Sequence, residues 1–388
     1  MATILYLDNA GLMGGAQRTL VSILAHLDRS RFEPSLVAPA GSELEKAARD
    51  LGVEVHNIEL KRFHRTINPA KLTAYLIDLK LKAKQLRDLL RTHSFDIVHA
   101  NSNIAAFYLA NAPRGREKRI WHSRDLVAIK MIKRQLLGGT DVTIAISNAV
   151  KRHLIAEGVP EERIRTIYNG IDPASAVGTS IRSELGLPAD AVVFTLIAFF
   201  YEWKGHKDFI FAFQKLLERQ PEARALIVGS DLFGDNKRYA QSVEKLATMI
   251  FKNEELRLVG RREDVNNIIA SSDVILCCST AEPFGRVYLE AFANGKPVIS
   301  YEGGAASEII QPGVSGVLTK AGAIHELTDA MEKFVTDREY RESFAGAITL
   351  DEKFNIIHGI RNMENLYDEL LEARSSEEAG EDQNSAES

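Results

Sequence analysis

The sequence predicts an α/β protein made of two doubly wound domains, each with a parallel sheet. Three observations support this fold class. Short apolar runs alternate with amphipathic stretches, the alternation breaks once and restarts, and 388 residues exceed what one hydrophobic core usually organises. The composition, 45% hydrophobic and 26% charged, is ordinary for a globular protein, and no apolar run approaches the roughly 18 residues that span a bilayer.

Each apolar run is short enough for a strand that is buried on both faces of a parallel sheet. In the first half we expect strands at residues 4–7, 33–38, 97–99, 119–122, 142–145 and 164–168. Helical spacing predicts helices between them at 15–27, 44–51, 71–92 and 147–157. Periodicity is lost at 172–181, and strands are then expected at 192–199, 224–228, 256–259, 274–278 and 297–300.

This alternation divides the chain into four segments. We expect an N-terminal domain over residues 1–175 and a second domain over 176–353. Residues 354–373 have a helical pattern, whereas 374–388 are polar and acidic and are expected to be disordered. Ligands of doubly wound sheets bind beyond the carboxyl ends of the strands, so a cleft between two such domains is the expected site.

Charge is unevenly distributed along the chain. Residues 1–180 contain 26 Lys and Arg against 18 Asp and Glu, a net charge of +8, and residues 181–388 have a net charge of −13. Many basic residues lie in 61–91, where leucines recur at helical spacing. We favour a packed helix with a solvated basic face, and the alternative is an interfacial helix that contacts anionic lipid. No recognition motif accompanies the charge, so nucleic acid is not an expected partner.

The N-terminal sequence and the two cysteines indicate in which cellular compartment the protein is expected. The first residues lack a basic n-region and form a buried-strand pattern, which argues against a signal peptide. Cys277 and Cys278 are adjacent in one strand pattern and point to opposite faces, so a disulfide between them is not expected. We therefore expect a cytoplasmic protein, with peripheral contact at the inner face of the membrane as an open alternative.

The most informative stretch is 282–290, which reads Glu-Pro-Phe-Gly-Arg-Val-Tyr-Leu-Glu between two buried-strand patterns. Glu282 and Glu290 are eight positions apart, a little over two helical turns, with Glu282 expected just before a helix and Glu290 inside it. A surface helix with two solvated glutamates is the simpler interpretation, but the flanking buried strands argue against it. A carboxylate can hold sugar hydroxyls and a helix N-terminus can hold phosphate, so this stretch predicts a sugar-nucleotide pocket.

The start of that helix carries part of the prediction. Pro283 suits a first helical turn, because its missing N–H is not needed there. Phe284 and Gly285 would then present free backbone N–H groups at the positive end of the helix dipole, which favours an anion.

With Gly303-Gly304 and Glu308 following, the region resembles the donor-binding region of the retaining glycosyltransferase family 4, which has the GT-B fold. The resemblance is strong over about residues 258–320 and looser up to about 372. It implies transfer of a hexose or hexosamine from a nucleoside diphosphate sugar to an acceptor hydroxyl, with the leaving phosphate taking the acceptor proton on the same face. It also implies a last helix that returns to the first domain. The acceptor would be a growing surface glycan, such as lipopolysaccharide, capsule or exopolysaccharide.

The resemblance assigns roles to single residues. His122 would line the sugar pocket, Lys204 would clamp the diphosphate, and Glu282 would bind the sugar near its 3- and 4-hydroxyls. Glu290 would bind the ribose. Arg124 is a further candidate for contact with an anionic acceptor. The remaining donor-binding candidates are loop and helix-start residues: Gly14, Gly15, Gly229, Arg261, Pro283, Phe284, Gly285 and Arg286.

One position departs from the family pattern. The family usually has Gly-Arg several residues before Lys-Gly, and here Ala198 and Phe199 occupy those places before Lys204. Loss of one charged partner of a desolvated phosphate costs on the order of a few kcal/mol. Lys207 and the Arg261-Arg262 pair are the candidates for compensation, and the alternative is a weakly held donor or reduced activity.

Other activities remain as alternatives. No Asp-x-Asp occurs in the sequence, and such a carboxylate pair would hold a metal across the diphosphate in GT-A enzymes, so neither a metal nor another cofactor is expected. A sugar-nucleotide-binding protein with little turnover would fit Phe199. A sugar-nucleotide epimerase would share the fold, whereas a phosphorylase would need a pyridoxal lysine motif that is not seen.

Overall fold

The computed structural model describes residues 1–62, 68–231, 234–252 and 254–386, and the chain forms two compact units. Unit 1 comprises Met1–Asn169 and Ile356–Ser388, and unit 2 comprises Gly170–Asn355. The sequence placed the boundary at 175 instead. The structure moves it earlier because Ile171 pairs with Asn355 in a β-bridge within unit 2.

The described part of unit 1 contains a seven-stranded parallel sheet in the order β3-β2-β1-β4-β5-β6-β7. Its strands are β1 (Ala2–Leu7), β2 (Phe32–Ala38), β3 (Glu54–Asn57), β4 (Ile97–Ala100), β5 (Lys118–Ser123), β6 (Val142–Ala145) and β7 (Ile164–Thr166). Strands β4, β5 and β6 are buried along their whole length, which explains their continuous apolar runs.

Helices connect these strands, as right-handed parallel crossovers require. They are α1 (Gly15–His26), α2 (Glu43–Asp50), α3 (Pro69–His93), α4 (Asn103–Ala110), α5 (Lys133–Gly139), α6 (Asn148–Ala156) and the short 3₁₀ helix η1 (Glu161–Arg163). Local sequence sets several starts. The Asn68 side chain accepts from the N–H groups of Ala70 and Lys71 at the start of α3, and Pro69 occupies its first turn.

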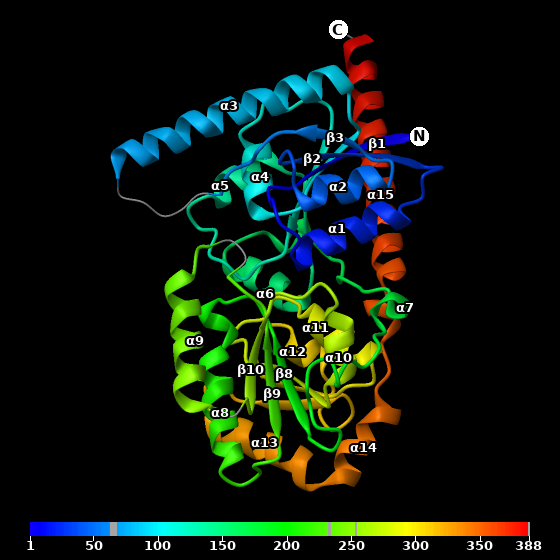
Figure 1. Cartoon of the computed structure of the whole chain (residues 1–388). Helices are drawn as coiled ribbons and strands as arrows, with labels where there is room; N and C mark the ends of the chain where they lie inside the picture. Colours follow the sequence, from blue (N-terminus) through cyan, green and yellow to red (C-terminus); the bar gives the residue numbers. More distant parts are fainter. Residues whose placement is uncertain (63–67, 232–233, 253, 387–388) are drawn as a thin grey trace. The chain divides into compact units, whose positions relative to one another are not determined.

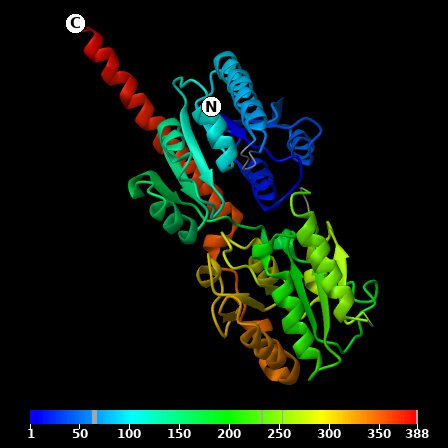
Figure 2. The ribbon, with the colours of Figure 1, turned by 90° about the vertical axis from the view of Figure 1, so that its left-hand side faces the viewer.

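The last helix, α15 (Ile356–Ala386), belongs to unit 1. It runs alongside the sheet in both views, with its final turns extending beyond it (Figures 1 and 2). Ile356, Ile360, Met363, Leu366 and Tyr367 join the core formed by β1, β2 and α1. We expected residues 374–388 to be disordered, but the helix continues to Ala386. Adding residues to an anchored helix needs no new nucleation, even for an acidic sequence.

Unit 2 has, in its described residues, a six-stranded parallel sheet in the order β10-β9-β8-β11-β12-β13. Its strands are β8 (Val193–Ile197), β9 (Arg224–Val228), β10 (Leu256–Gly260), β11 (Val274–Cys277), β12 (Val298–Tyr301) and β13 (Gly316–Thr319). Helices α8 and α9 lie side by side along one face (Figure 1). The prediction of two doubly wound parallel sheets is therefore confirmed.

The helices of unit 2 are α7 (Pro173–Ala176), η2 (Glu202–Lys204), α8 (His206–Leu217), α9 (Lys237–Ile250), α10 (Val265–Ser271), α11 (Arg286–Ala293), α12 (Ala306–Ile309), α13 (Ile324–Thr336), α14 (Arg338–Ala347) and η3 (Glu352–Phe354). Phe209, Phe213, Met331 and Phe334 are fully buried at the centre of the core that α8 and α13 share. Among the residues that the structure describes, no helix is both long and apolar enough to cross a bilayer.

Two strands were absent from the sequence prediction, β3 and β13. Each lies at an edge of its sheet: β3 mixes buried with exposed positions and β13 mixes buried with partly buried ones, so neither gives a continuous apolar run. The central strands, which are buried on both faces, were found because burial imposes that run on their sequence.

Candidate active site

In unit 2, two predicted site residues meet at the carboxyl end of the sheet. Lys204 follows β8 and Glu282 follows β11, and these strands are neighbours although the residues are 78 positions apart. Lys204 Nζ lies 2.6 Å from Glu282 Oε2, with the side chains 16% and 10% exposed. The strand order reverses between β8 and β11, which is where doubly wound sheets bind ligands.

Close backbone packing holds the Glu282 loop. A Cβ on Gly304, which has φ +56°, would lie 2.0 Å from the Glu282 carbonyl oxygen, so only glycine fits there. That carbonyl accepts a hydrogen bond from the Ala305 N–H at 2.8 Å. The Gly303-Gly304 pair of the sequence motif therefore has a direct structural reason: it lets two loops approach closely enough to fix the carboxylate.

The helix start differs from the prediction. Helix α11 begins at Arg286, with Gly285 as its N-cap at φ +86°, and Pro283 and Phe284 lie in the turn before it. The Phe284 ring is buried against the Phe354 ring, with their centroids 6.0 Å apart. The exposed N-terminal N–H groups therefore belong to the first turn from Arg286 onward, and Pro283 shapes the preceding turn.

Glu290 lies within α11, one turn after Arg286. Arg286 Nη2 and Glu290 Oε1 are 3.3 Å apart, an i,i+4 pair whose two side chains are about one-fifth exposed. Each of the two predicted carboxylates thus has its own cation, Lys204 for Glu282 and Arg286 for Glu290.

The loop after β8 contains Phe199, which is partly buried. A Cβ on Gly229 would lie 1.9 Å from the Ala198 carbonyl oxygen, so this glycine allows the loop after β9 to pack on the Phe199 loop. Of the candidates for compensation, Arg262 pairs with Asp264 and Glu184 at 2.7 and 3.0 Å.

The other two candidates are placed differently. Lys207 Nζ lies 5.3 Å from the centre of the Tyr239 ring. Arg261 follows the end of β10 at Gly260 and has an exposed side chain.

In unit 1, the predicted glycine loop opens α1. Gly14 is the N-cap and donates its N–H to Gln17 Oε1 at 3.2 Å, and Gln17 Nε2 donates to both oxygens of Asp8 at 3.1 Å. Asp8 is fully buried directly after β1, and burial raises the pKa of its carboxyl group. Asn101, which follows the neighbouring strand β4, donates to Asp8 at 2.6 Å. These contacts fix the backbone that carries Gly14 and Gly15.

His122 lies on β5 at the end of a buried hydrogen-bond chain. The hydroxyls of Tyr6 and Tyr367 are 2.9 Å apart, and the Tyr367 hydroxyl lies 2.7 Å from His99 Nδ1. His99 Nε2 is then 2.9 Å from His122 Nδ1. All four side chains are at most 1% exposed, so this chain connects α15 with β1, β4 and β5 inside the core of unit 1.

The direction of this chain follows from Arg124. Arg124 Nη2 lies 3.3 Å from His122 Nδ1 and can only donate, so Nδ1 is an acceptor and the proton of His122 is on Nε2. His99 then donates through Nε2 and accepts from Tyr367 at Nδ1. Burial lowers the pKa of His99 to about 3 and that of His122 well below its usual value, so both imidazoles are neutral. His122 Nε2 is buried with no hydrogen-bond partner among the described residues.

Arg124 is buried, and its guanidinium group is held by hydrogen bonds to two asparagines. Its Nε and Nη2 donate to Asn101 Oδ1 at 2.9 and 2.6 Å, and its Nη1 donates to Asn169 Oδ1 at 2.9 Å. The guanidinium thus holds the His122 environment together. A role in contacting an anionic acceptor is less suited to a side chain with these partners.

Comparison with known proteins gives two family matches that together cover most of the chain. Residues 13–175 match the model "Glycosyltransferase Family 4", and residues 178–349 match "Glycosyl transferases group 1". The chain belongs to this glycosyltransferase family. The family is retaining and uses nucleotide sugars, and the resemblance seen in the sequence is thereby confirmed.

Several named proteins are similar to this glycosyltransferase. It is 26% identical over 328 residues to N-acetyl-alpha-D-glucosaminyl L-malate synthase of Bacillus anthracis, covering 77% of this chain and 84% of that protein. It is 30% identical over 195 residues to the lipopolysaccharide core biosynthesis glycosyltransferase LpsE of Rhizobium meliloti, covering 49% and 54%. Anabaena Alr3699/HepE in complex with UDP-glucose has a similar structure, with a TM-score of 0.79 and 25% identity over 95% of this chain and 100% of that one.

Sequence reasoning missed the residues that hold the Gly14 loop and those that support His122. Asp8 and Asn101 are polar residues directly after buried strands, a signal that could have revealed them. His99 and Tyr367 gave no such signal, because one lies within a strand and the other on the inner face of a helix 268 residues away.

Proposed function

We propose that this glycosyltransferase transfers a hexose or hexosamine from a UDP-sugar to a hydroxyl of a growing surface glycan. The observation that carries the proposal is the Lys204–Glu282 pair at the point of strand reversal in unit 2. An ammonium group suits the diphosphate, and a carboxylate held by the Gly304 loop suits sugar hydroxyls. The UDP-glucose complex of HepE and the lipopolysaccharide role of LpsE support the donor and the acceptor class.

In the proposed reaction the bond from the anomeric carbon to the diphosphate oxygen breaks, and a bond to the acceptor oxygen forms on the same face. The leaving phosphate takes the acceptor proton. Lys204 and the first N–H groups of α11 stabilise the diphosphate as negative charge develops on it. Glu282 orients the sugar, and Glu290 binds the ribose. Gly14, Gly15, Gly229, Arg261 and the turn at Pro283, Phe284 and Gly285 shape the rest of the donor site.

His122 acts as a hydrogen-bond donor in this proposal. A neutral imidazole with its proton on Nε2 can donate to a sugar oxygen, and it cannot accept the acceptor's proton through that nitrogen. The absence of a protein base at this position agrees with a mechanism in which the phosphate takes the proton.

The donor is tested by thermal shift with UDP-, GDP-, ADP- and dTDP-sugars, without added metal. We expect a shift with UDP-sugars that is lost in Glu290→Ala and kept in Glu244→Ala, a matched change at an exposed position of α9. A shift with another nucleotide class would overturn the choice of base. No shift with any of them would favour the second candidate function.

That second candidate is a sugar-nucleotide-binding protein with little turnover, and Phe199 is the observation in its favour. Phe199→Arg restores the charge that the family usually has there. If Arg261 already compensates, this change leaves donor turnover unchanged or lowers it through lost packing. A large gain in turnover would instead indicate that the natural protein is a weak enzyme.

We also propose that α3 contacts an anionic membrane surface. Figure 1 shows α3 along the outside of unit 1, and Ile77 and Leu81 on it are 54% and 56% exposed, with Lys80 and Lys84 beside them. Exposed apolar side chains flanked by lysines are typical of interfacial helices. Sedimentation with vesicles containing one-third phosphatidylglycerol should fall for Leu81→Glu, and it should not fall for Met249→Glu, at an apolar position of α9 that is 63% exposed.

A further inference from the structure

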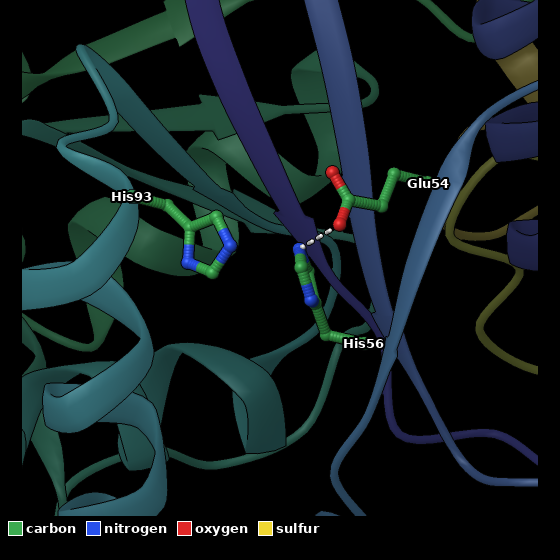
Figure 3. Close-up of side chains that lie close together, drawn as sticks. All are labelled: Glu54, His56 and His93. Carbon is green, nitrogen blue, oxygen red and sulfur yellow. Dashed lines mark ion pairs between the residues drawn. The ribbon is translucent and has the colours of Figure 1, made fainter.

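Two histidines and a glutamate come together at the edge of the unit 1 sheet, away from every residue assigned above. Glu54 and His56 are two positions apart on β3, so both side chains lie on the same face of this edge strand. His93 is the last residue of α3. One potential ligand atom from each of the three residues lies within 4.8 Å of the other two (Figure 3).

The three side chains offer the right atoms. His56 Nε2 is buried without a hydrogen-bond partner in the described ranges, and its distance of 3.8 Å from Glu54 Oε1 is too long for a hydrogen bond. Figure 3 shows the His56 and His93 rings next to each other at a tilt, with the Glu54 carboxylate close to the His56 ring. Their ring centroids are 5.0 Å apart.

The surroundings orient His93 as metal-binding histidines are usually oriented. Its Nδ1 lies 3.3 Å from the Leu89 carbonyl oxygen, and donation to that oxygen puts the proton on Nδ1 and leaves Nε2 with a free lone pair. A backbone carbonyl is a common second partner of a metal-binding imidazole. Phe95 stacks on the His93 ring and meets the His56 ring edge-on, which restricts both imidazoles.

We propose that Glu54, His56 and His93 bind a divalent first-row transition metal ion of the zinc class. Two imidazoles and one carboxylate are a common donor set for Zn²⁺, and water would complete a tetrahedral shell. Ligand atoms around such an ion are roughly 3.4 Å apart at bond lengths of about 2.0–2.1 Å. Since the atoms now lie within 4.8 Å of one another, they must approach by at most about 1.4 Å, which side-chain rotation can supply because the Glu54 side chain is 64% exposed.

The ion would have a structural role. In the sheet order, β2, β1 and β4 separate β3 from β5, which carries His122, a distance of roughly 19 Å at about 4.8 Å per strand. The metal would thus take no part in sugar transfer. It would fasten the C-terminal end of α3 to the exposed edge strand β3, joining two elements that the chain connects only through residues 58–68.

The test uses the full-length protein after treatment with a chelator. Titration with Co²⁺ should give visible d–d absorption with one equivalent bound, and Zn²⁺ should displace the cobalt and raise the melting temperature. Both responses should weaken at least tenfold in apparent affinity in His93→Ala, and they should be unchanged in His325→Ala, which removes an exposed histidine of α13.

A second variant controls for the case in which His93→Ala does not fold. Glu54→Gln keeps the size of an exposed side chain and removes its charge, so it should fold normally and still weaken metal binding. Cobalt binding that is absent in the natural protein, or equal in natural protein, His93→Ala and Glu54→Gln, would overturn the proposal. Neither result depends on transferase activity, so the proposal fails or stands separately from the proposed function.

Discussion

Replacing Tyr367 by phenylalanine tests the buried chain that ends at His122. The change keeps the ring in the core and removes one hydroxyl, which leaves the Tyr6 hydroxyl without its acceptor and His99 Nδ1 without its donor. An unsatisfied buried polar group costs about 1–3 kcal/mol, so we expect the free energy of unfolding to fall by about 2–4 kcal/mol. For a unit of this size the melting temperature should fall by roughly 5–10 °C.

The control is Tyr6→Phe, at the far end of the same chain. Tyr367 still donates to His99 in that variant, so one acceptor loses a partner and no donor does. We expect a loss of about 1 kcal/mol or less. The two substitutions remove the same atom from the same residue type, and both side chains are fully buried. The difference between their losses in free energy of unfolding therefore isolates the hydrogen bond to His99.

The ring nitrogens of the two histidines provide a readout that a general loss of stability would not change. Nitrogen NMR of protein labelled in histidine should show the proton of His122 on Nε2 in natural protein and in both variants, because Arg124 still donates to His122 Nδ1. In Tyr367→Phe the signal of His99 Nδ1 should shift because this nitrogen loses its donor, and in Tyr6→Phe it should not. Identical stability and an identical His99 Nδ1 signal in both variants would refute the directed chain.

Three further predictions concern the site and its pH dependence. Lys204→Met leaves Glu282 without its cation and should weaken UDP-sugar binding at least tenfold by calorimetry, and an unchanged affinity would remove Lys204 from the donor site. Gly285→Ala places a Cβ 2.3 Å from the Tyr288 ring at φ +86°, so we expect a loss of about 2–4 kcal/mol in urea unfolding, and a loss under 1 kcal/mol would contradict this geometry. Folding lowers the pKa of His99 to about 3 from about 6.5, so the unfolded chain gains a proton first as pH falls. Stability should therefore drop by up to about 1.4 kcal/mol per pH unit from pH 6.5 toward pH 3, and a urea midpoint that rises between pH 7 and pH 5 would contradict a neutral buried His99.

The sequence was sufficient to predict the features for which burial requires a local pattern of apolar residues. Central strands such as β4 and β11 are enclosed on both faces, and their continuous apolar runs located them. The stretch from Glu282 to Glu290 likewise carries its meaning in spacing, because a helix period and the residues before it are local. Gly303-Gly304 could be recognised as part of the motif, although its purpose could not.

Only the tertiary structure decided which distant residues meet. Lys204 reaches Glu282 because β8 and β11 are neighbours, and strand order leaves no mark on the sequence of either strand. His122 is linked through His99 to Tyr367, which belongs to a helix at the other end of the chain. Edge strand β3 was missed because half of it faces solvent, and with it the juxtaposition of His56 and His93. Local patterns record whether a residue is buried, whereas its partners are fixed by how the chain folds back on itself.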